Sequence, residues 1–182
     1  MSGHSHWAGI KHRKGINDAK RAKIFTKHGK LITIAARSGD GNPDTNFQLR
    51  LAIERARAEN MPKENIERSI KRGTGELKDS AEIQEALYEA YGPGQVAMLI
   101  KTATDNKNRT LGELKTILPK AGGKMVPAGS VSYLFKRLYR DSELIYEPIQ
   151  KTALDEKAKL DYEKLLELLD DQDDVQEIYD NL

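Results

Sequence analysis

Apolar residues recur at helical spacing in the first part of the chain and predict three helices. The first, near residues 17–38, has one apolar stripe formed by Ile24, His28, Leu31 and Ala35. A stretch containing Gly and Pro then breaks the pattern, and a second helix is expected near residues 44–59. In a third helix, Pro62 suits the first helical position and Gly73 ends it. Together these segments predict a small three-helix bundle.

After Gly75 the pattern changes to that of strands. A hairpin is expected from residues 83–91 and 96–102, because the Pro-Gly pair between them favours a type II turn. Further strands are expected at residues 131–135, 144–151 and 175–179. Thr110 and Glu113 form the pattern of a capping box for a helix at 111–120, and Asp155 is expected to cap another helix. The order ββαββαβ predicts an α+β domain with helices over one face of a sheet.

The chain is therefore expected to contain two domains. Residues 1–75 form a basic three-helix N-terminal domain with a flexible tail at 1–16, and residues 76–182 form the α+β sheet domain. A length of 182 residues allows two small domains, each able to bury a core.

Charge is distributed very unevenly along the chain, although the formal net charge is only +2. Residues 1–73 carry 16 basic and 7 acidic side chains, whereas residues 151–182 carry 4 basic and 11 acidic ones. From residue 1 to 37 there are nine Lys or Arg and only one acid, Asp18. A segregated basic segment is typical of proteins that bind polyanions, because cations placed on phosphates release condensed counterions. We therefore expect nucleic acid to be the partner.

Two groups of residues in this segment are the candidates for contact with nucleic acid. In the first dozen or so residues, an aromatic ring that could stack on a base stands among cations that could follow phosphates; these are Trp7, Lys11, His12, Arg13 and Lys14. The second group lies on the first predicted helix, where positions 20, 23, 27 and 30 share one face, and consists of Lys20, Arg21, Lys23, Lys27 and Lys30.

Other classes of function are disfavoured by the composition. The chain has no Cys, which excludes disulfides and thiolate sites and suits a reducing compartment. No apolar run is long enough to span a bilayer and the first residues lack a secretory signal, so a cytoplasmic location is expected, with no membrane partner. No catalytic nucleophile with its base or phosphate-binding glycine loop is evident, and no metal site or cofactor is expected. The protein is expected not to be an enzyme.

Several motifs resemble those of the YebC/PmpR family. They include the opening Gly-His-Ser-His-Trp-Ala-Gly-Ile-Lys-His-Arg-Lys at residues 3–14 and Tyr-Gly-Pro-Gly at 91–94. They also include Thr-Asp-Asn-Lys-Asn-Arg-Thr at 104–110, Gly-Ser-Val at 129–131 and Asp-Asp-Val-Gln at 173–176. The resemblance runs over nearly the whole chain. It implies a nucleic-acid-binding regulator of gene expression, described in bacteria as a probable transcriptional regulator and related to the mitochondrial translational activators of cytochrome c oxidase.

The resemblance also implies a helical domain followed by two α+β domains, the third inserted into the second. In this chain the segment after Phe135 leads directly to residues that normally follow the insertion, so most of the third domain is expected to be missing near 136–143. The functional hypothesis is a factor that binds ribosomal RNA or the ribosome. One alternative is a DNA-binding transcriptional regulator that uses the same basic domain. Another is a scaffold whose acidic C-terminal segment docks a basic partner. The sequence leaves the oligomeric state open.

Overall fold

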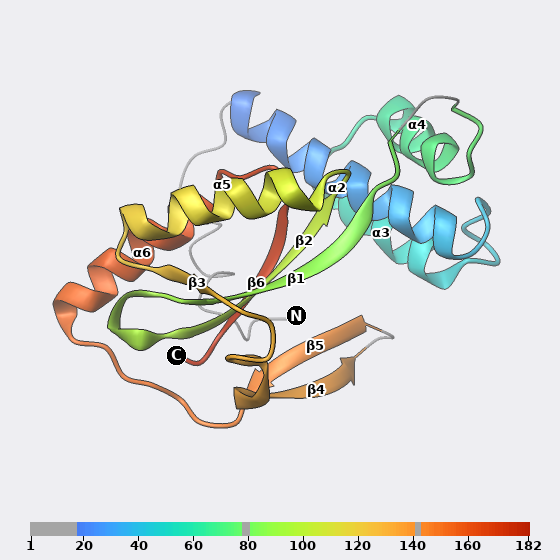
Figure 1. The fold of residues 1–182 in the computed structure, drawn as a ribbon. Helices are drawn as coiled ribbons and strands as arrows, with labels where there is room; N and C mark the ends of the chain where they lie inside the picture. The colour runs from blue at the N-terminus through green and yellow to red at the C-terminus, as the bar shows by residue number, and fades with distance from the viewer. Residues whose placement is uncertain (1–17, 78–80, 141–142) are drawn as a thin grey trace. The chain divides into compact units, whose positions relative to one another are not determined.

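A computed structural model describes residues 18–77, 81–140 and 143–182 of the chain (Figure 1). The described residues divide into two compact units. One unit contains the helices up to about residue 85 together with residues 103–106, and the other contains residues 86–102 and 107–182. Each unit is described by itself below.

The helical unit consists of α2 (Asp18–Ser38), α3 (Phe47–Ala58) and α4 (Lys63–Gly73). Helix α2 packs against both α3 and α4. The core between them contains Ile32 and Ala36 of α2, Leu49 and Ile53 of α3, and Ile66 of α4. The apolar stripe predicted for the first helix was wrong in detail, since Ile24 and Leu31 are only half-buried, while Ile32 and Ala36 are buried. A helix with two packing partners buries a broader face than a single stripe indicates.

Local hydrogen bonds set the boundaries of these helices. Asn46 is the N-cap of α3, because its side chain accepts a hydrogen bond from the backbone N–H of Leu49 at 3.0 Å. The side-chain amide of Asn46 also donates to the carbonyls of Ala35 and Asp40, both at 2.8 Å. Helix α3 therefore begins three residues later than residue 44, where the sequence placed it. Pro62 is the N-cap of α4 rather than its first residue.

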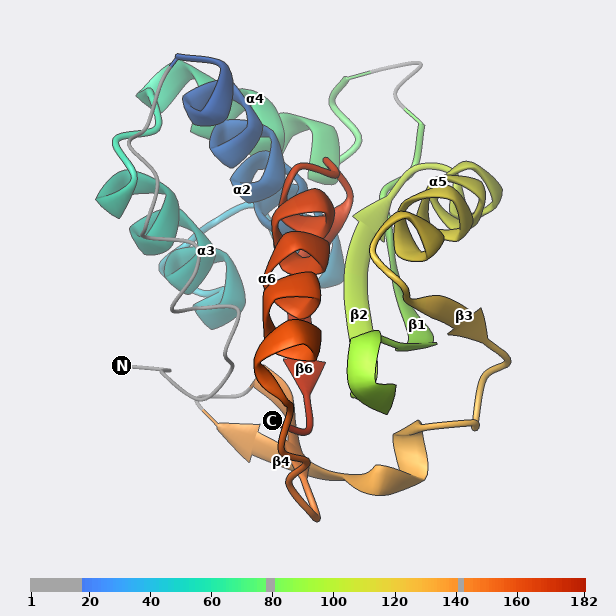
Figure 2. The same cartoon turned by 90° about the vertical axis from the view of Figure 1, so that its left-hand side faces the viewer.

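The second unit is built on a four-stranded sheet with the strand order β3-β1-β2-β6. These strands are β1 (Gln84–Tyr91), β2 (Ala97–Thr104), β3 (Lys124–Val126) and β6 (Val175–Asp180). Helices α5 (Lys107–Lys120) and α6 (Glu156–Asp170) lie together on one face of this sheet (Figure 2). Met98 and Ile100 of β2 pack against Leu114 of α5 and Leu166 of α6. The predicted α+β class is confirmed.

The opposite face of the sheet has a core of its own. Ala97 and Leu99 of β2 point to this face, as expected for positions that alternate with Met98 and Ile100, and pack with Val131 and Phe135. Strand β2 is thus buried on both faces, which explains its continuous apolar sequence. Next to this core, β4 (Phe135–Arg140) pairs antiparallel with β5 (Glu143–Pro148) in a separate two-stranded sheet.

Three details of the predicted order ββαββαβ were wrong. Strand β3 was not predicted, since it has only three residues and follows two glycines. The strand expected at 131–135 is a 3₁₀ turn at Ser132–Leu134 that leads into β4. Helix α5 begins at Lys107, so Thr110 lies inside the helix and is not its N-cap. By contrast, Asp155 caps α6 as predicted, accepting from the N–H of Ala158 at 2.7 Å.

Candidate nucleic-acid interface

Helix α2 has the largest net positive charge of the three helices in the helical unit. Its 21 residues include six Lys or Arg and a single acid, Asp18. Arg21 forms an exposed ion pair with Asp18 at 3.6 Å. An exposed ion pair of this kind contributes little to stability. Near the C-terminus of α2, Arg37 forms an ion pair with Glu82 at 2.9 Å and donates to the carbonyl of Ile83. The other four cations of α2 are lysines, and they lie between residues 20 and 30.

The predicted lysine face of α2 is less exposed than helical spacing alone suggested. Lys20, Lys23 and Lys30 are half-buried, and only 7% of Lys27 is exposed. Arg21 is exposed. A half-buried lysine can still reach a phosphate, since its long aliphatic stem packs on apolar atoms while its ammonium group stays in water. Lys27 is the weakest of the α2 candidates because its whole side chain is enclosed.

The first group of candidates lies outside the described residues. This holds for Trp7, Lys11, His12, Arg13 and Lys14, so their contribution to the interface stays a prediction.

Helices α3 and α4 supply exposed cations that the sequence analysis did not select. Arg50, Arg55 and Arg57 of α3 are exposed, as are Arg68 and Lys71 of α4. The guanidinium of Arg50 lies 5.4 Å from the centre of the Phe47 ring, and 48% of Phe47 is exposed. An exposed aromatic ring beside an arginine can stack on a nucleic-acid base. The arginine-rich polar face of residues 50–57 is the sequence feature that could have identified these cations of α3.

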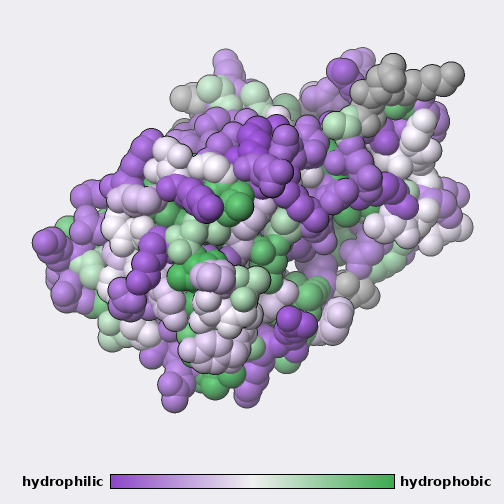
Figure 3. All heavy atoms as spheres, viewed as in Figure 1, coloured by the Kyte–Doolittle hydropathy of each residue, from purple (hydrophilic) through white to green (hydrophobic). Residues whose placement is uncertain are grey.

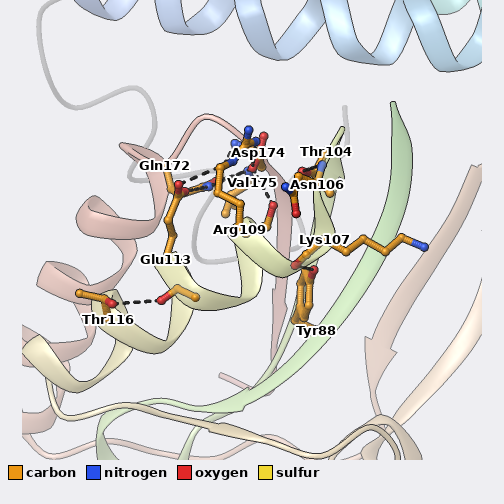
Figure 4. A network of polar contacts seen from close by, with 12 residues as sticks. Tyr88, Thr104, Asn106, Lys107, Arg109, Glu113, Thr116, Gln172, Asp174 and Val175 are labelled. Atoms are coloured by element: carbon orange, nitrogen blue, oxygen red, sulfur yellow. Dashed lines mark hydrogen bonds and ion pairs between the residues drawn. The ribbon is translucent and has the colours of Figure 1, made fainter. Parts of the chain in front are cut away.

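A buried polar network in the second unit brings together residues that are far apart in the sequence (Figure 4). The carboxylate of Asp174, whose residue is 1% exposed, accepts from Arg109 at 2.8 Å and from the hydroxyl of Thr110 at 2.7 Å. The side-chain carbonyl of Gln172 accepts from the N–H groups of Asp174 and Val175, and its amide donates to Glu113 at 2.7 Å. The network ties the start of α5 to the turn before β6.

Two of the motifs that carry the family resemblance meet in this network. Arg109 and Thr110 belong to the motif at 104–110, while Asp174 and Val175 belong to the motif at 173–176. Asp174 is buried and accepts hydrogen bonds from three donors. The role of the network is therefore to stabilise the fold. Asp174 stands in an acidic run at residues 170–174, yet it is one of the most buried carboxylates in the described part of the chain.

A second buried carboxylate, that of Glu89 on β1, holds the loop that contains the Gly-Ser-Val motif. It accepts from the backbone N–H groups of Gly129 at 2.7 Å, Val131 at 2.6 Å and Ser132 at 3.1 Å. Burial raises the pKa of Glu89, but the hydrogen bonds from Val131, Gly129 and Ser132 outweigh it, and the pKa lies below its ordinary value. Glu89 is thus charged at neutral pH and fixes the chain just before β4.

Buried tyrosines complete the polar interior of this unit. The hydroxyl of Tyr162 donates to Asp180 at 2.9 Å. Burial, and then the charge and hydrogen bond of Asp180, raise the pKa of Tyr162 well above its ordinary value. A hydroxyl that stays protonated in this way serves as a permanent donor, which suits a structural role.

The described residues contain no cluster of three or more His, Asp or Glu side chains that could hold a metal ion. None of the helices in this part of the chain is long and apolar enough to cross a membrane. The face drawn in Figure 3 is mostly hydrophilic.

Comparison with known proteins identifies the family. A model of the TACO1/YebC protein N-terminal domain matches residues 5–76, and a model of the TACO1/YebC second and third domain matches residues 83–140 and 136–182. The chain belongs to the TACO1/YebC family. The resemblance found in the sequence is confirmed. Only residues 141 and 142 separate β4 from β5.

Bacterial members of the family are similar to this chain over most of its length. A "probable transcriptional regulatory protein" from Thermotoga maritima is 54% identical over 87% of this chain and 64% of the relative. One with the same description from Petrotoga mobilis is 51% identical over 98% of this chain and 69% of the relative. The chain thus spans slightly less than two thirds of the length of the Thermotoga relative.

A solved crystal structure has a fold similar to that of this chain. The crystal structure of a conserved hypothetical protein from Aquifex aeolicus matches with a TM-score of 0.85 at 34% sequence identity. The match covers 97% of this chain and 96% of that one. The fold described above is therefore shared with a protein whose structure was determined by crystallography.

Proposed function

We propose that the protein is a non-enzymatic, cytoplasmic regulator of gene expression that binds ribosomal RNA through its basic N-terminal domain, residues 1–75. The observation that carries this proposal is the charge of α2, with six cations against one acid on a helix of 21 residues. Counterion release from phosphates gives such a helix a general affinity for nucleic acid.

The type of cation favours a structured RNA as the target. Four of the six cations of α2 are lysines, which act on phosphates as point charges and lack the planar, preorganised fork with which arginine reads base edges. Phosphate contacts position a protein but carry no sequence information. A large folded RNA can be recognised by shape and charge, so this helix needs no base readout to find such a target.

Duplex DNA is the second candidate, and two observations favour it. The relatives from Thermotoga maritima and Petrotoga mobilis are named as probable transcriptional regulatory proteins. In addition, α3 exposes three arginines, Arg50, Arg55 and Arg57, and arginine is the residue that most often contacts guanine in the major groove.

The proposal predicts binding that weakens steeply as salt rises. If about five side chains contact phosphates, the slope of log K against log salt on duplex DNA is expected to be about −4 to −5. Reversing the charge of five cations in the basic segment should abolish binding to structured RNA and to duplex DNA. The variant changes Lys11, Arg13, Lys14, Lys20 and Arg21 to Glu, and binding is measured by fluorescence anisotropy.

The matched control makes the same change of charge elsewhere. It replaces five exposed lysines of the α+β domain by Glu, namely Lys115, Lys120, Lys151, Lys157 and Lys159. This control should bind with nearly the affinity of the unmodified protein. Equal loss of binding in the two variants would mean that total charge, and not the N-terminal segment, determines the affinity, and the proposal would fail.

A further inference from the structure

The described residues expose few large hydrophobic side chains, and two of them are tyrosines in one short segment. Tyr133 in the 3₁₀ turn before β4 is 66% exposed, and Tyr139 near the end of β4 is 79% exposed. Strand β4 also carries three exposed cations, Lys136, Arg137 and Arg140. Exposed aromatic rings interleaved with cations are the features with which proteins bind single-stranded nucleic acid.

The register of β4 with β5 separates these side chains onto two faces. Lys136 stands opposite Glu147, and Arg140 stands opposite Glu143 and lies 3.7 Å from Glu147. Residues directly opposite in an antiparallel pair share a face, so each of these cations has a carboxylate beside it. On this face the positive charge is compensated.

On the other face, neither β4 nor β5 contributes an acidic residue. It contains Phe135, Arg137 and Tyr139 of β4 and, opposite them, Pro148, Tyr146 and Leu144 of β5. Phe135 is buried in the core beneath, and Tyr146 packs edge-on against Tyr179 with ring centres 5.1 Å apart. This anchors the base of the strand pair, while Arg137 and Tyr139 remain exposed further along β4. Arg137 and Tyr139 are two residues apart on one face, or about 6–7 Å.

We propose that Arg137 and Tyr139 form a second contact surface for nucleic acid, which binds an unpaired strand of RNA. The ring of Tyr139 stacks on a base, and the guanidinium of Arg137 binds the adjacent phosphate. Neither β4 nor β5 places an acidic residue beside Arg137 on this face, so no carboxylate of these two strands competes with the phosphate for Arg137. The surface depends on the proposed function only for the class of ligand, because it lies on the α+β domain and not on the basic helices.

The test uses the full chain and a short single-stranded RNA of mixed sequence that contains 4-thiouridine. Light-induced crosslinking followed by mass spectrometry should place a crosslink at Tyr139. Anisotropy measurements should show binding about tenfold weaker for Tyr139→Ala, whereas Tyr139→Phe, which keeps the stacking ring, should bind like the unmodified protein. Arg137→Gln should reduce the magnitude of the salt slope by about 0.7, the value for one phosphate contact on a single strand.

Lys136→Gln is the matched control, because it removes one charge from the same strand on the compensated face. It should leave the affinity and the salt slope unchanged. An equal effect of Lys136→Gln and Arg137→Gln, or the absence of any crosslink at Tyr139, would overturn the proposal.

The crosslink also separates this proposal from the proposed function. In the variant with five N-terminal cations changed to Glu, the crosslink at Tyr139 should persist although binding to structured RNA is lost. If the N-terminal variant kept its binding to structured RNA while Tyr139 still crosslinked, the proposed function would fail and the second surface would stand. Loss of the Tyr139 crosslink in that variant would show that the surface does not bind RNA by itself.

Discussion

The carboxylate of Glu89 ties three backbone N–H groups to β1, and its ionisation should therefore affect stability. Its pKa in the folded protein lies below the ordinary value of 4.5. The stabilisation is fully present above about pH 4.5 and is lost as the pH falls through the lower, folded-state pKa. We expect the free energy of unfolding, measured with urea at a series of pH values, to decline in that acidic range.

Glu89→Gln should cost about 1–3 kcal/mol at neutral pH, because one amide oxygen cannot replace a charged carboxylate that accepts three donors. The free energy of unfolding of this variant should also decline less steeply below pH 4.5 than that of the unmodified protein. Glu54→Gln, at an exposed position of α3, serves as the control and should leave the stability within about 0.5 kcal/mol. A Glu89→Gln variant with the stability and acid response of the unmodified protein would show that the loop does not depend on this carboxylate.

Residues whose partners are close in sequence could be predicted, and those with distant partners could not. Asp155 caps α6 through a residue three positions away, so the sequence alone identified it. Asp174 receives hydrogen bonds from side chains more than 60 positions away, and Glu89 from a loop about 40 positions away. Nothing in the acidic run at 170–174 distinguishes the buried aspartate from its exposed neighbours. Thr110 was predicted to be a helix cap because Asp174, to which its hydroxyl donates, lies 64 positions away in the sequence.

Helix α4 approaches α2 so closely that one position requires glycine. A Cβ atom added at Gly73 would lie 2.5 Å from the carbonyl oxygen of Thr33 and 2.7 Å from the Cβ of Ala36. The first of these atoms belongs to the backbone and cannot turn aside. Gly73→Ala should therefore lower the free energy of unfolding by about 1–3 kcal/mol through overpacking, as measured by urea denaturation.

The control is a second glycine within a helix. At Gly112 of α5 nothing lies within 4 Å of the added Cβ, so Gly112→Ala should raise the stability by about 0.5–1 kcal/mol. If the two substitutions changed stability in the same direction, the close approach of α2 and α4 would not be the reason for Gly73.

Among the elements, the long helices and the buried strand β2 could be predicted because their patterns span many residues. The segment at 131–135 could not, since its apolar residues fill a core from a 3₁₀ turn and not from a strand. Strand β3 owes its existence to pairing with β1 through only three residues, Lys124–Val126. A pattern so short gives no periodicity. The lysines do lie on the helix α2 that was predicted. Their spacing, however, could not show that Lys27 is buried.

At the scale of the whole molecule, we expect residues 76–182 to fold alone. Both hydrophobic clusters of the sheet are built from residues 87–182, and β4 joins β5 through two residues. The isolated fragment should show a sigmoidal thermal transition in circular dichroism. Leu166→Ala in the fragment, which removes a fully buried side chain between α6 and the sheet, should lower the midpoint. A fragment without a cooperative transition would contradict the expected domain boundary.

The central claim is that the basic N-terminal domain directs the protein to ribosomal RNA. The measurement that tests it most directly is crosslinking in cells, followed by sequencing of both the bound RNA and the bound DNA, together with sedimentation of the protein with ribosomes. We expect crosslinks concentrated in ribosomal RNA, and protein in the ribosomal fractions that the five-cation Glu variant no longer enters. Enrichment of a few promoter sequences, with none of the protein in the ribosomal fractions, would contradict this claim and establish duplex DNA as the target.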